Sequence, residues 1–163
     1  MVRIAICSDI HDNIWKLETA LPGMNEANIL IFCGDFCAPF TLAQLARGFD
    51  GPVHAVFGNN DGDQRLLLTI ANEVGNVTLH GHFADLDVGG LRIAVNHYPD
   101  IARGLAQGGG FDVVCYGHDH ELHEGKAGDT LLLNPGELMG RFGRSTYMLL
   151  DTSSRSVTVR DVE

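Results

Sequence analysis

The sequence predicts an α/β fold in which two mixed β-sheets face each other and helices cover their outer faces, a four-layer αββα sandwich. Up to about residue 75, short apolar runs alternate with helical segments, which is typical of a largely parallel sheet. Beyond that point the apolar runs follow one another through tight turns, which favours a mixed or antiparallel sheet. Packing the two sheets face to face, with helices outside, would bury both.

The first half is expected to alternate strands and helices. Apolar, β-branched runs predict buried strands at residues 2–7, 28–33 and 53–57. Asn13 is placed to cap a helix that ends near residue 21, because Pro22-Gly23 would stop it. Further helices are expected at residues 39–47 and 64–74.

The second half is expected to be rich in strands. Short apolar runs predict strands at residues 76–80, 83–88, 91–97, 112–116, 122–126, 130–133, 146–150 and 157–160. A helix is expected at residues 100–107, before a run of glycines. Turn sequences separate these elements: Gly89-Gly90, Asn134-Pro135-Gly136 and Ser153-Ser154.

Length and composition limit the classes of function. With 163 residues, of which 45% are hydrophobic and 20% charged, the chain suits a single domain over residues 1–163. The net charge of -10 argues against a large nucleic-acid footprint and against an anionic membrane surface. No apolar run approaches the ~20 residues of a membrane span, and the start lacks the layout of a signal peptide. We therefore expect a cytoplasmic protein.

The cysteines are expected to be reduced core residues. Cys7, Cys33 and Cys115 fall at the ends of apolar runs, where a free thiol packs as a small hydrophobic group. Cys33 and Cys37 do not have the spacing of a CxxC motif, so zinc or redox chemistry is not favoured.

Polar clusters follow the apolar runs where strands are expected to end. They are Asp9-x-His11, Gly34-Asp35, Gly58-Asn59-Asn60-Asp61, His97 and Gly117-His118-Asp119-His120. Ligand sites of open α/β sheets gather at the carboxyl ends of strands. Carboxylates, an amide and imidazoles, without a thiolate, suit Mn²⁺, Fe, Zn²⁺ or Ni²⁺. Taken singly, each cluster is more often a turn, a helix cap or a structural histidine.

The order of these clusters resembles that of the calcineurin-like metallophosphoesterases. The family pattern is D-x-H, then G-D, then G-N-x-D/E, then a lone H, then G-H-x-H, and all five parts occur in order between Asp9 and His120. The chain looks most like the small single-domain branch of bacterial and archaeal phosphodiesterases, which also carries the turn seen at residues 134–136. The resemblance implies the metallophosphoesterase fold and makes a two-metal site the preferred interpretation of the clusters.

The resemblance also implies a ligand set for each ion. It assigns the first ion to Asp9, His11, Asp35 and His120, and the second to Asp35, Asn59, His97 and His118. Asp35 would bridge both ions, together with a hydroxide that attacks the phosphate ester. The expected catalytic residues are therefore Asp35, Asn59 and His97. Two divalent ions per chain are expected, with Mn²⁺ favoured and Ni²⁺, Zn²⁺ or Fe as alternatives.

Further residues are expected beside the ligands or the substrate: Asp12, Asn60, Asp61, Tyr98 and Asp119. Asp12 would cap a helix or support a ligand. Asn60 stands where many family members have a histidine thought to protonate the leaving group, and an amide can only hydrogen-bond. Tyr98 would change the pocket wall, and Asp119 would either orient a ligand imidazole or face solvent.

Other basic residues lie outside the family pattern. His54, His80, His82 and His123 are expected at the surface or beside the ligands. Arg141 and Arg144 follow the predicted turn at residues 134–136. They would either contact a phosphate or remain surface charges.

Together these expectations describe a metal-dependent phosphoesterase, more specifically a phosphodiesterase that hydrolyses small phosphate esters. Long nucleic acids and membranes are not expected partners, and the oligomeric state stays open, a homo-oligomer included. A phosphomonoesterase or a nucleotide-pyrophosphate hydrolase with the same site is the alternative. A non-catalytic interaction scaffold, like a retromer subunit of the family, is disfavoured because this chain keeps all the expected ligands.

Overall fold

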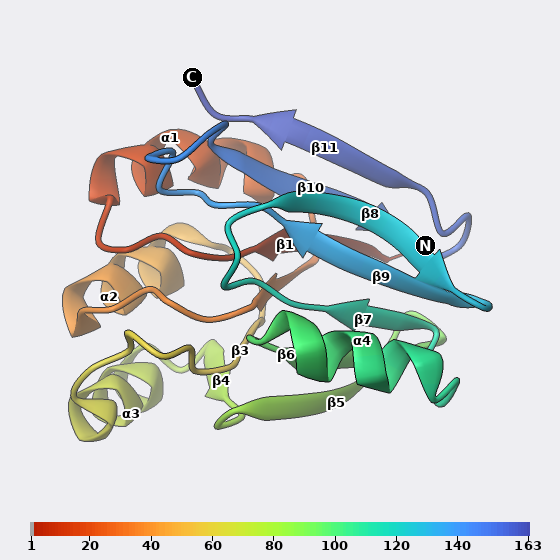
Figure 1. The fold of residues 1–163 in the computed structure, drawn as a ribbon. Coiled ribbons are helices and arrows are strands. Elements are labelled where there is room, and N and C mark those ends of the chain that lie inside the picture. The colour runs from red at the N-terminus through yellow and green to blue at the C-terminus, as the bar shows by residue number, and fades with distance from the viewer. Residues whose placement is uncertain (1) are drawn as a thin grey trace.

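The computed structural model describes residues 2–163, and Met1 of the expected domain lies outside the described residues. Within this range, two mixed β-sheets face each other and helices cover the outer face of each (Figure 1). The predicted α/β class with two facing sheets is confirmed. The strands differ from their predicted ranges mainly by one or two residues at the ends.

The first sheet has six strands in the order β11-β10-β1-β2-β3-β4. Its parallel part consists of β1 to β4, formed by Arg3–Cys7, Ile29–Phe32, Val53–Ala55 and Val77–Leu79. Strands β10 (Thr146–Asp151) and β11 (Val157–Asp161) add to it beside β1, and both contacts are antiparallel. The end of the chain therefore completes the sheet that the start of the chain begins.

The second sheet has five strands in the order β5-β6-β7-β9-β8. Its hairpins pair β5 (Phe83–Val88) with β6 (Leu91–Asn96), and β8 (Leu122–Ala127) with β9 (Thr130–Pro135). Strand β7 (Val113–Cys115) lies between the hairpins and runs parallel to both β6 and β9. The sheet is therefore mixed, as expected.

The helices form the outer layers. Helices α1 (Ile14–Met24), α2 (Pro39–Gly48) and α3 (Gln64–Val74) pack their apolar faces on the first sheet. Helix α4 (Pro99–Gln107) covers the second sheet with Ala102 and Ala106 (Figure 1). Small side chains on α4 let the helix lie close to the strands beneath it.

Alternate side chains of β1 serve two different cores. Ile4 and Ile6 point toward the second sheet, where they belong to the apolar layer between the sheets. Ala5 and Cys7 point the other way, into the layer under α1, α2 and α3. This alternation is the period of two that a strand imposes on its side chains. Because both faces of β1 are buried, residues 4–7 are all apolar.

Cysteine usage agrees with the expectation from the sequence. Cys7, Cys33 and Cys115 are buried and free, and Cys37 is free and partly buried. Burial raises the pKa of the Cys115 thiol to about 12, so the thiol is neutral at physiological pH.

The expected end of the first helix at Pro22-Gly23 is wrong. Helix α1 continues through Pro22 to Met24, and Asn13 caps its start by accepting a hydrogen bond from the Lys16 backbone N. Pro22 is exposed, so the carbonyl that loses its helical partner can bind water. Met24 is fully buried, and packing of the last turn holds the helix together.

The expected turn at residues 134–136 begins later than predicted. Asn134 and Pro135 are the last residues of β9, where they pair with His123 and Leu122 of β8. Proline is tolerated because it stands at the end of the strand. Only Gly136, with φ of 77°, turns the chain.

Among residues 2–163, no helix is long and apolar enough to span a membrane.

The hairpin turn between β5 and β6 gives a test of the packing. Gly89 and Gly90 both have positive φ, 58° and 83°. A Cβ on Gly89 would lie 2.5 Å from Thr152 Oγ1, whereas a Cβ on Gly90 would meet no heavy atom within 4 Å. We predict that Gly90→Ala lowers the free energy of unfolding by about 1 kcal/mol through backbone strain alone, and that Gly89→Ala lowers it further. Equilibrium urea denaturation measures both, and equal losses would contradict the contact with Thr152.

Candidate metal centre

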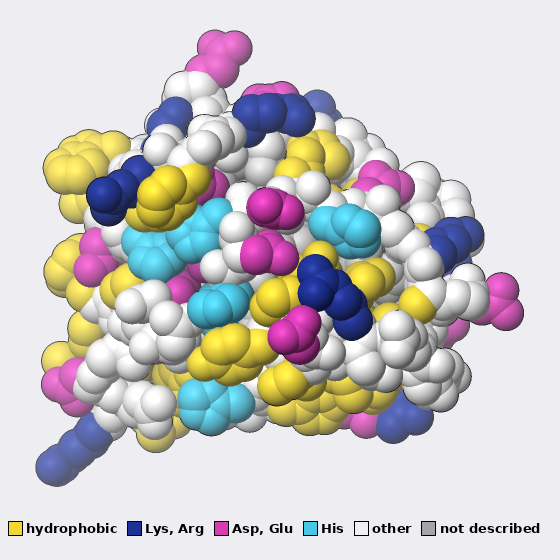
Figure 2. Space-filling view, viewed as in Figure 1, with side chains coloured by type: hydrophobic (Ala, Val, Ile, Leu, Met, Phe, Trp, Pro, Cys, Tyr) yellow, Lys and Arg dark blue, Asp and Glu magenta, His cyan; other side chains and the backbone are white. Residues whose placement is uncertain are grey.

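The polar clusters lie in loops that follow β1, β2, β3, β6 and β7. Parallel pairing brings the carboxyl ends of these strands to one edge of each sheet. A hydrogen bond joins the two sheets there, since the His118 backbone N donates to Asp9 Oδ2 at 3.1 Å. Figure 2 shows histidine side chains gathered on one face of the molecule, with acidic side chains beside them.

The backbone of these loops is strained at the chemistry-bearing residues. A positive φ between 43° and 76° occurs at Asp9, His11, Asp35, His118 and His120. This left-handed region costs a non-glycine residue about 1–3 kcal/mol and is concentrated at functional sites. Asp tolerates it better than most residues because its short side chain hydrogen-bonds locally.

Two of the motif glycines are required by close approach. A Cβ on Gly58 would overlap Asp35 Oδ1, and a Cβ on Gly117 would overlap Ser8 Oγ. Gly58 allows its loop to pack against the loop of Asp35 after the neighbouring strand β2, and Gly117 allows its loop to pack against the loop of Asp9 in the facing sheet. The glycine before Asn59 and the glycine before His118 have this packing role.

The first group of side chains surrounds Asp9, which is fully buried. Asp9 Oδ1 lies 3.4 Å from His11 Nε2 and 3.4 Å from His120 Nε2. These atoms all lie within 4.8 Å of one another, as the ligands of one metal ion would. The sequence separates His11 from His120 by more than a hundred residues, and the fold brings them together.

The second group surrounds the side-chain oxygen of Asn59. Asn59 Oδ1 lies 3.1 Å from His97 Nε2 and 2.9 Å from His118 Nδ1. Asp35 Oδ2 lies 3.4 Å from His97 Nε2 and also 3.4 Å from His11 Nε2. The carboxylate of Asp35 therefore lies between the two groups.

Hydrogen bonds fix the charge and orientation of Asp35. Asn60 donates its backbone N to Oδ1 and its side-chain Nδ2 to Oδ2, both at 2.8 Å. Burial raises the pKa of Asp35, but the nearby imidazole of His97 and the hydrogen bonds from Asn60 outweigh burial and hold the pKa well below its usual range. Asp35 is therefore an anion at neutral pH.

Two atoms at the centre of the first group test whether a metal ion fits. Asp9 Oδ1 and His11 Nε2 are buried and have no hydrogen-bond partner among the described residues. An unsatisfied buried polar atom costs about 1–3 kcal/mol. A divalent cation would satisfy both atoms and compensate the buried charges of Asp9 and Asp35. The donors are nitrogen and oxygen atoms, so the site fits a divalent metal ion.

Comparison with known families agrees with this geometry. The sequence profile described as the calcineurin-like phosphoesterase superfamily domain matches residues 2–155. The chain belongs to the calcineurin-like phosphoesterase superfamily. Members of this family bind divalent metal ions. In this chain Asp9, His11 and His120 offer donor atoms within 4.8 Å of one another, and so do Asp9, Asp35 and His97.

Individual members of the superfamily are similar over nearly the whole chain. The chain is 29% identical to Phosphodiesterase MJ0936 of Methanocaldococcus jannaschii over 94% of its own length and 95% of that protein. It is 31% identical to the probable metallophosphoesterase YsnB of Bacillus subtilis, with 98% and 89% covered. The solved structure of a novel archaeal phosphodiesterase matches with a TM-score of 0.90 and 28% identity, covering 98% of this chain and 99% of that one.

Asn60 follows the candidate ligand Asn59 in the loop after β3. Its backbone N and its side-chain Nδ2 both donate hydrogen bonds to the carboxylate of Asp35. The structure therefore gives Asn60 a positioning role toward Asp35, a contact that the sequence did not specify. Asp61 supports the same loop, because its Oδ2 accepts hydrogen bonds from the backbone N of Asp35 and of Gly58, at 3.0 and 2.7 Å.

Asp12 caps a different helix from the one that it precedes. Its Oδ1 accepts hydrogen bonds from the Ala38 backbone N at 2.8 Å and from Thr41 Oγ1 at 2.6 Å. These groups belong to the start of α2, whereas Asn13 caps α1. Asp12 thus joins the loop of His11 to the helix that follows Asp35.

Asp119 and Tyr98 have separate structural roles. Asp119 Oδ1 accepts a hydrogen bond from Asn134 Nδ2 at 2.6 Å, which ties the loop of His118 and His120 to β9. Tyr98 packs edge-on against His97 and His118, with ring centroids 5.3 and 5.1 Å apart. Tyr98 therefore lies beside the second group.

Glu137 is a residue of the centre that the sequence did not indicate. It is fully buried, and its Oε2 accepts a hydrogen bond from His120 Nδ1 at 2.8 Å. The bond leaves His120 Nε2 facing Asp9, an arrangement in which a carboxylate sets the tautomer of a metal-binding histidine. The only signal in the sequence is a carboxylate directly after Asn134-Pro135-Gly136.

His54 and His80 contact each other rather than the two donor groups. His54 Nδ1 and His80 Nε2 are 3.0 Å from each other, between β3 and β4. Burial lowers the pKa of both imidazoles, so both are neutral at physiological pH. Arg144 pairs with Asp161 through two hydrogen bonds of 2.7 Å, which matches a surface charge rather than a phosphate contact.

The hydrogen bond between Glu137 and His120 predicts that a change at Glu137 weakens metal binding, although Glu137 is not a candidate ligand. Glu137→Gln should weaken the binding of Mn²⁺ about 10- to 100-fold, because the amide no longer holds His120 as the carboxylate does. Isothermal titration calorimetry of metal-free protein measures this. Glu124→Gln, which makes the same change on the exposed strand β8, is the control and should bind as the wild type does. Unchanged affinity in Glu137→Gln would contradict the role of Glu137.

Proposed function

We propose that this chain is a metal-dependent phosphodiesterase that hydrolyses small phosphate esters. The observation that carries the proposal is the position of Asp35, whose Oδ2 lies 3.4 Å from a histidine nitrogen of each donor group. A carboxylate shared in this way is the arrangement that two-metal phosphoesterases need. The names of the relatives, a phosphodiesterase and a probable metallophosphoesterase, support the reaction class.

In this proposal the ligands divide as the family resemblance implies. Asp9, His11, Asp35 and His120 would hold one divalent ion, and Asp35, Asn59, His97 and His118 would hold the other. When bound, the ions supply positive charge that polarises phosphoryl oxygens and lowers the pKa of water. We propose Mn²⁺ as the native metal, with Ni²⁺, Zn²⁺ and Fe as alternatives that suit the same donors.

The chain's own residues prepare the site for an anionic substrate. Asn60 and Asp61 hold the loop and carboxylate of Asp35, and Cys33 O accepts a hydrogen bond from His97 Nδ1 at 2.7 Å. This bond fixes the tautomer that leaves His97 Nε2 free to face Asp35 and Asn59. The ring of Tyr98 limits the space beside the second group.

The alternatives share the site but differ in substrate. A phosphomonoesterase or nucleotide-pyrophosphate hydrolase would use the same ligands. The buried atoms of Asp9 and His11 that lack a partner among the described residues favour a bound cation, which would remove their cost. The names of the relatives, a phosphodiesterase and a probable metallophosphoesterase, favour the enzyme over a non-catalytic scaffold. The proposal also places the protein in the cytoplasm and gives it no membrane or long nucleic-acid partner.

Asp35→Asn tests the proposal most simply. The amide keeps the shape of the side chain but loses the shared negative charge, so we predict a loss of at least about 1,000-fold in kcat/KM, or about 4 kcal/mol of transition-state stabilisation. Purified protein with Mn²⁺, Ni²⁺ or Zn²⁺ would be assayed on bis(p-nitrophenyl) phosphate and on p-nitrophenyl phosphate. Asp87→Asn, on the exposed face of β5, is the matched control.

Two results would overturn the proposed function. One is the absence of hydrolysis of every ester with each metal, while elemental analysis finds fewer than about two metal ions per chain. The other is full activity of Asp35→Asn. A preference for p-nitrophenyl phosphate over the diester would replace the phosphodiesterase proposal with the phosphomonoesterase alternative.

A further inference from the structure

A short loop carries an exposed aromatic ring to the edge of the metal centre. Phe142 is 72% exposed, and its ring lies edge-on to His120 with centroids 5.3 Å apart. Single exposed aromatic residues are ordinary on protein surfaces. This one differs because it stands against a candidate metal ligand. Figure 2 shows hydrophobic and basic side chains next to the histidine cluster.

Glu137 holds this loop and the candidate ligand with one carboxylate. Its Oε1 accepts hydrogen bonds from the backbone N of Phe142 and of Gly143, while Oε2 accepts the bond from His120. The position of the Phe142 backbone is therefore fixed relative to the metal centre. An exposed ring on a fixed backbone is suited to binding, because little conformational freedom is lost when a ligand packs on it.

A cavity of about 670 Å³ lies between the loop of His118 and His120 and the loop of Phe142. Two candidate ligands line it together with acidic, basic and aromatic side chains: His118, His120, Asp119, Glu121, Arg144 and Phe142. Because His118 and His120 border both the cavity and the metal centre, we expect one ester arm of a phosphate held at the centre to lie in this cavity. The volume is in the range of small-molecule sites and admits an arm of the size of a nucleoside.

The chemistry around the ring favours a flat, electron-rich arm. The guanidinium carbon of Arg141 lies 5.3 Å from the centroid of Phe142, a cation–π distance. Aromatic rings beside arginine are the platforms on which nucleic-acid bases stack in proteins. An alkyl or sugar arm would gain little from this pair.

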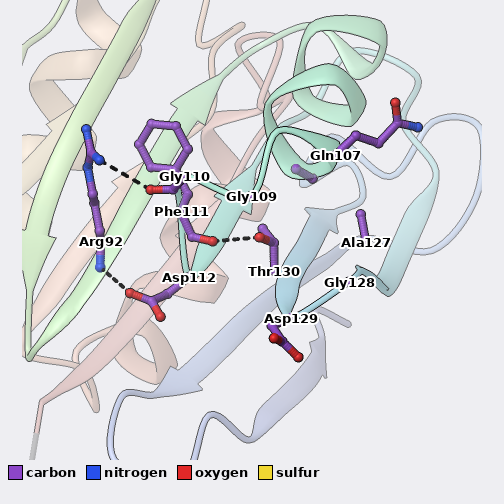
Figure 3. Close-up of a pocket in the computed structure, with 11 residues that line it drawn as sticks. Arg92, Gln107, Gly109, Gly110, Phe111, Asp112, Ala127, Gly128, Asp129 and Thr130 are labelled. Carbon is purple, nitrogen blue, oxygen red and sulfur yellow. Dashed lines mark hydrogen bonds between the residues drawn. The ribbon is translucent and has the colours of Figure 1, made fainter.

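A second cavity is less suited to binding a ligand, because several of its polar groups bind one another. It has about 780 Å³ and lies at the opposite edge of the second sheet, beside the starts of β6, β7 and β9. Its polar groups bind one another, since Arg92 donates to Gly110 O and Thr130 Oγ1 donates to Phe111 O (Figure 3). Few groups there are free to recognise a ligand.

We propose that Phe142 is a stacking platform for the base of a nucleotide arm, which makes nucleotide-containing diesters the substrate class. The proposal rests on the proposed function, because the phosphate must be held at the metal centre for the arm to reach the ring. Arg141 lies beside the same ring and adds its cation–π contact to the platform. Specificity would thus come from a residue that is not a metal ligand.

The test compares two monophosphates that differ only in the base, AMP and ribose 5-phosphate. Isothermal titration calorimetry with Mn²⁺-loaded protein should give AMP a dissociation constant at least about fivefold lower than that of ribose 5-phosphate. Phe142→Ala should bring the two dissociation constants together, and Phe142→Tyr should restore the difference. Phe40→Ala removes the same ring from an exposed site on α2, and should leave the difference unchanged.

The outcomes separate this proposal from the proposed function. Hydrolysis of bis(p-nitrophenyl) phosphate by the same preparation, together with equal binding of the two monophosphates, would overturn the stacking platform alone. Loss of the AMP preference in Tyr98→Ala but not in Phe142→Ala would also overturn it, because the base would then stack on the other wall. Absence of both hydrolysis and monophosphate binding would overturn both proposals.

Discussion

The carboxylate of Asp35 is the group on which the rest of the centre depends. It is almost fully buried, it is ionised, and it lies 3.4 Å from a histidine nitrogen in each donor group. Asn60 and the loop held by Asp61 fix it in place. The other candidate ligands are arranged around this anion and come from the loops after β1, β3, β6 and β7.

The architecture explains how such a centre forms and what it costs. Parallel strands of both sheets deliver their loops to the same edge, and the apolar layer between the sheets keeps those edges in register. The loops adopt left-handed backbone at Asp9, Asp35 and His118, among others, and they leave Asp9 Oδ1 without a partner. These local costs are tolerated because buried apolar strands on either side stabilise the fold.

The sequence predicted much of the fold and the residues at the strand ends, because period-two apolar runs and turn glycines are local signals. The local sequence does not predict that α1 continues through Pro22, because the last turn of the helix is stabilised by the burial of Met24. The same holds for Glu137, whose role exists only because β9 places it beside His120. The contact of Asn60 with Asp35 depends on how two loops pack, which the local sequence does not show.

Anomalous X-ray diffraction from crystals grown with Mn²⁺ tests the central claim most directly. The account predicts two peaks per chain that share Asp35: one against Asp9, His11 and His120, and the other against Asn59, His97 and His118. A single peak, or peaks that do not contact Asp35, would contradict the account.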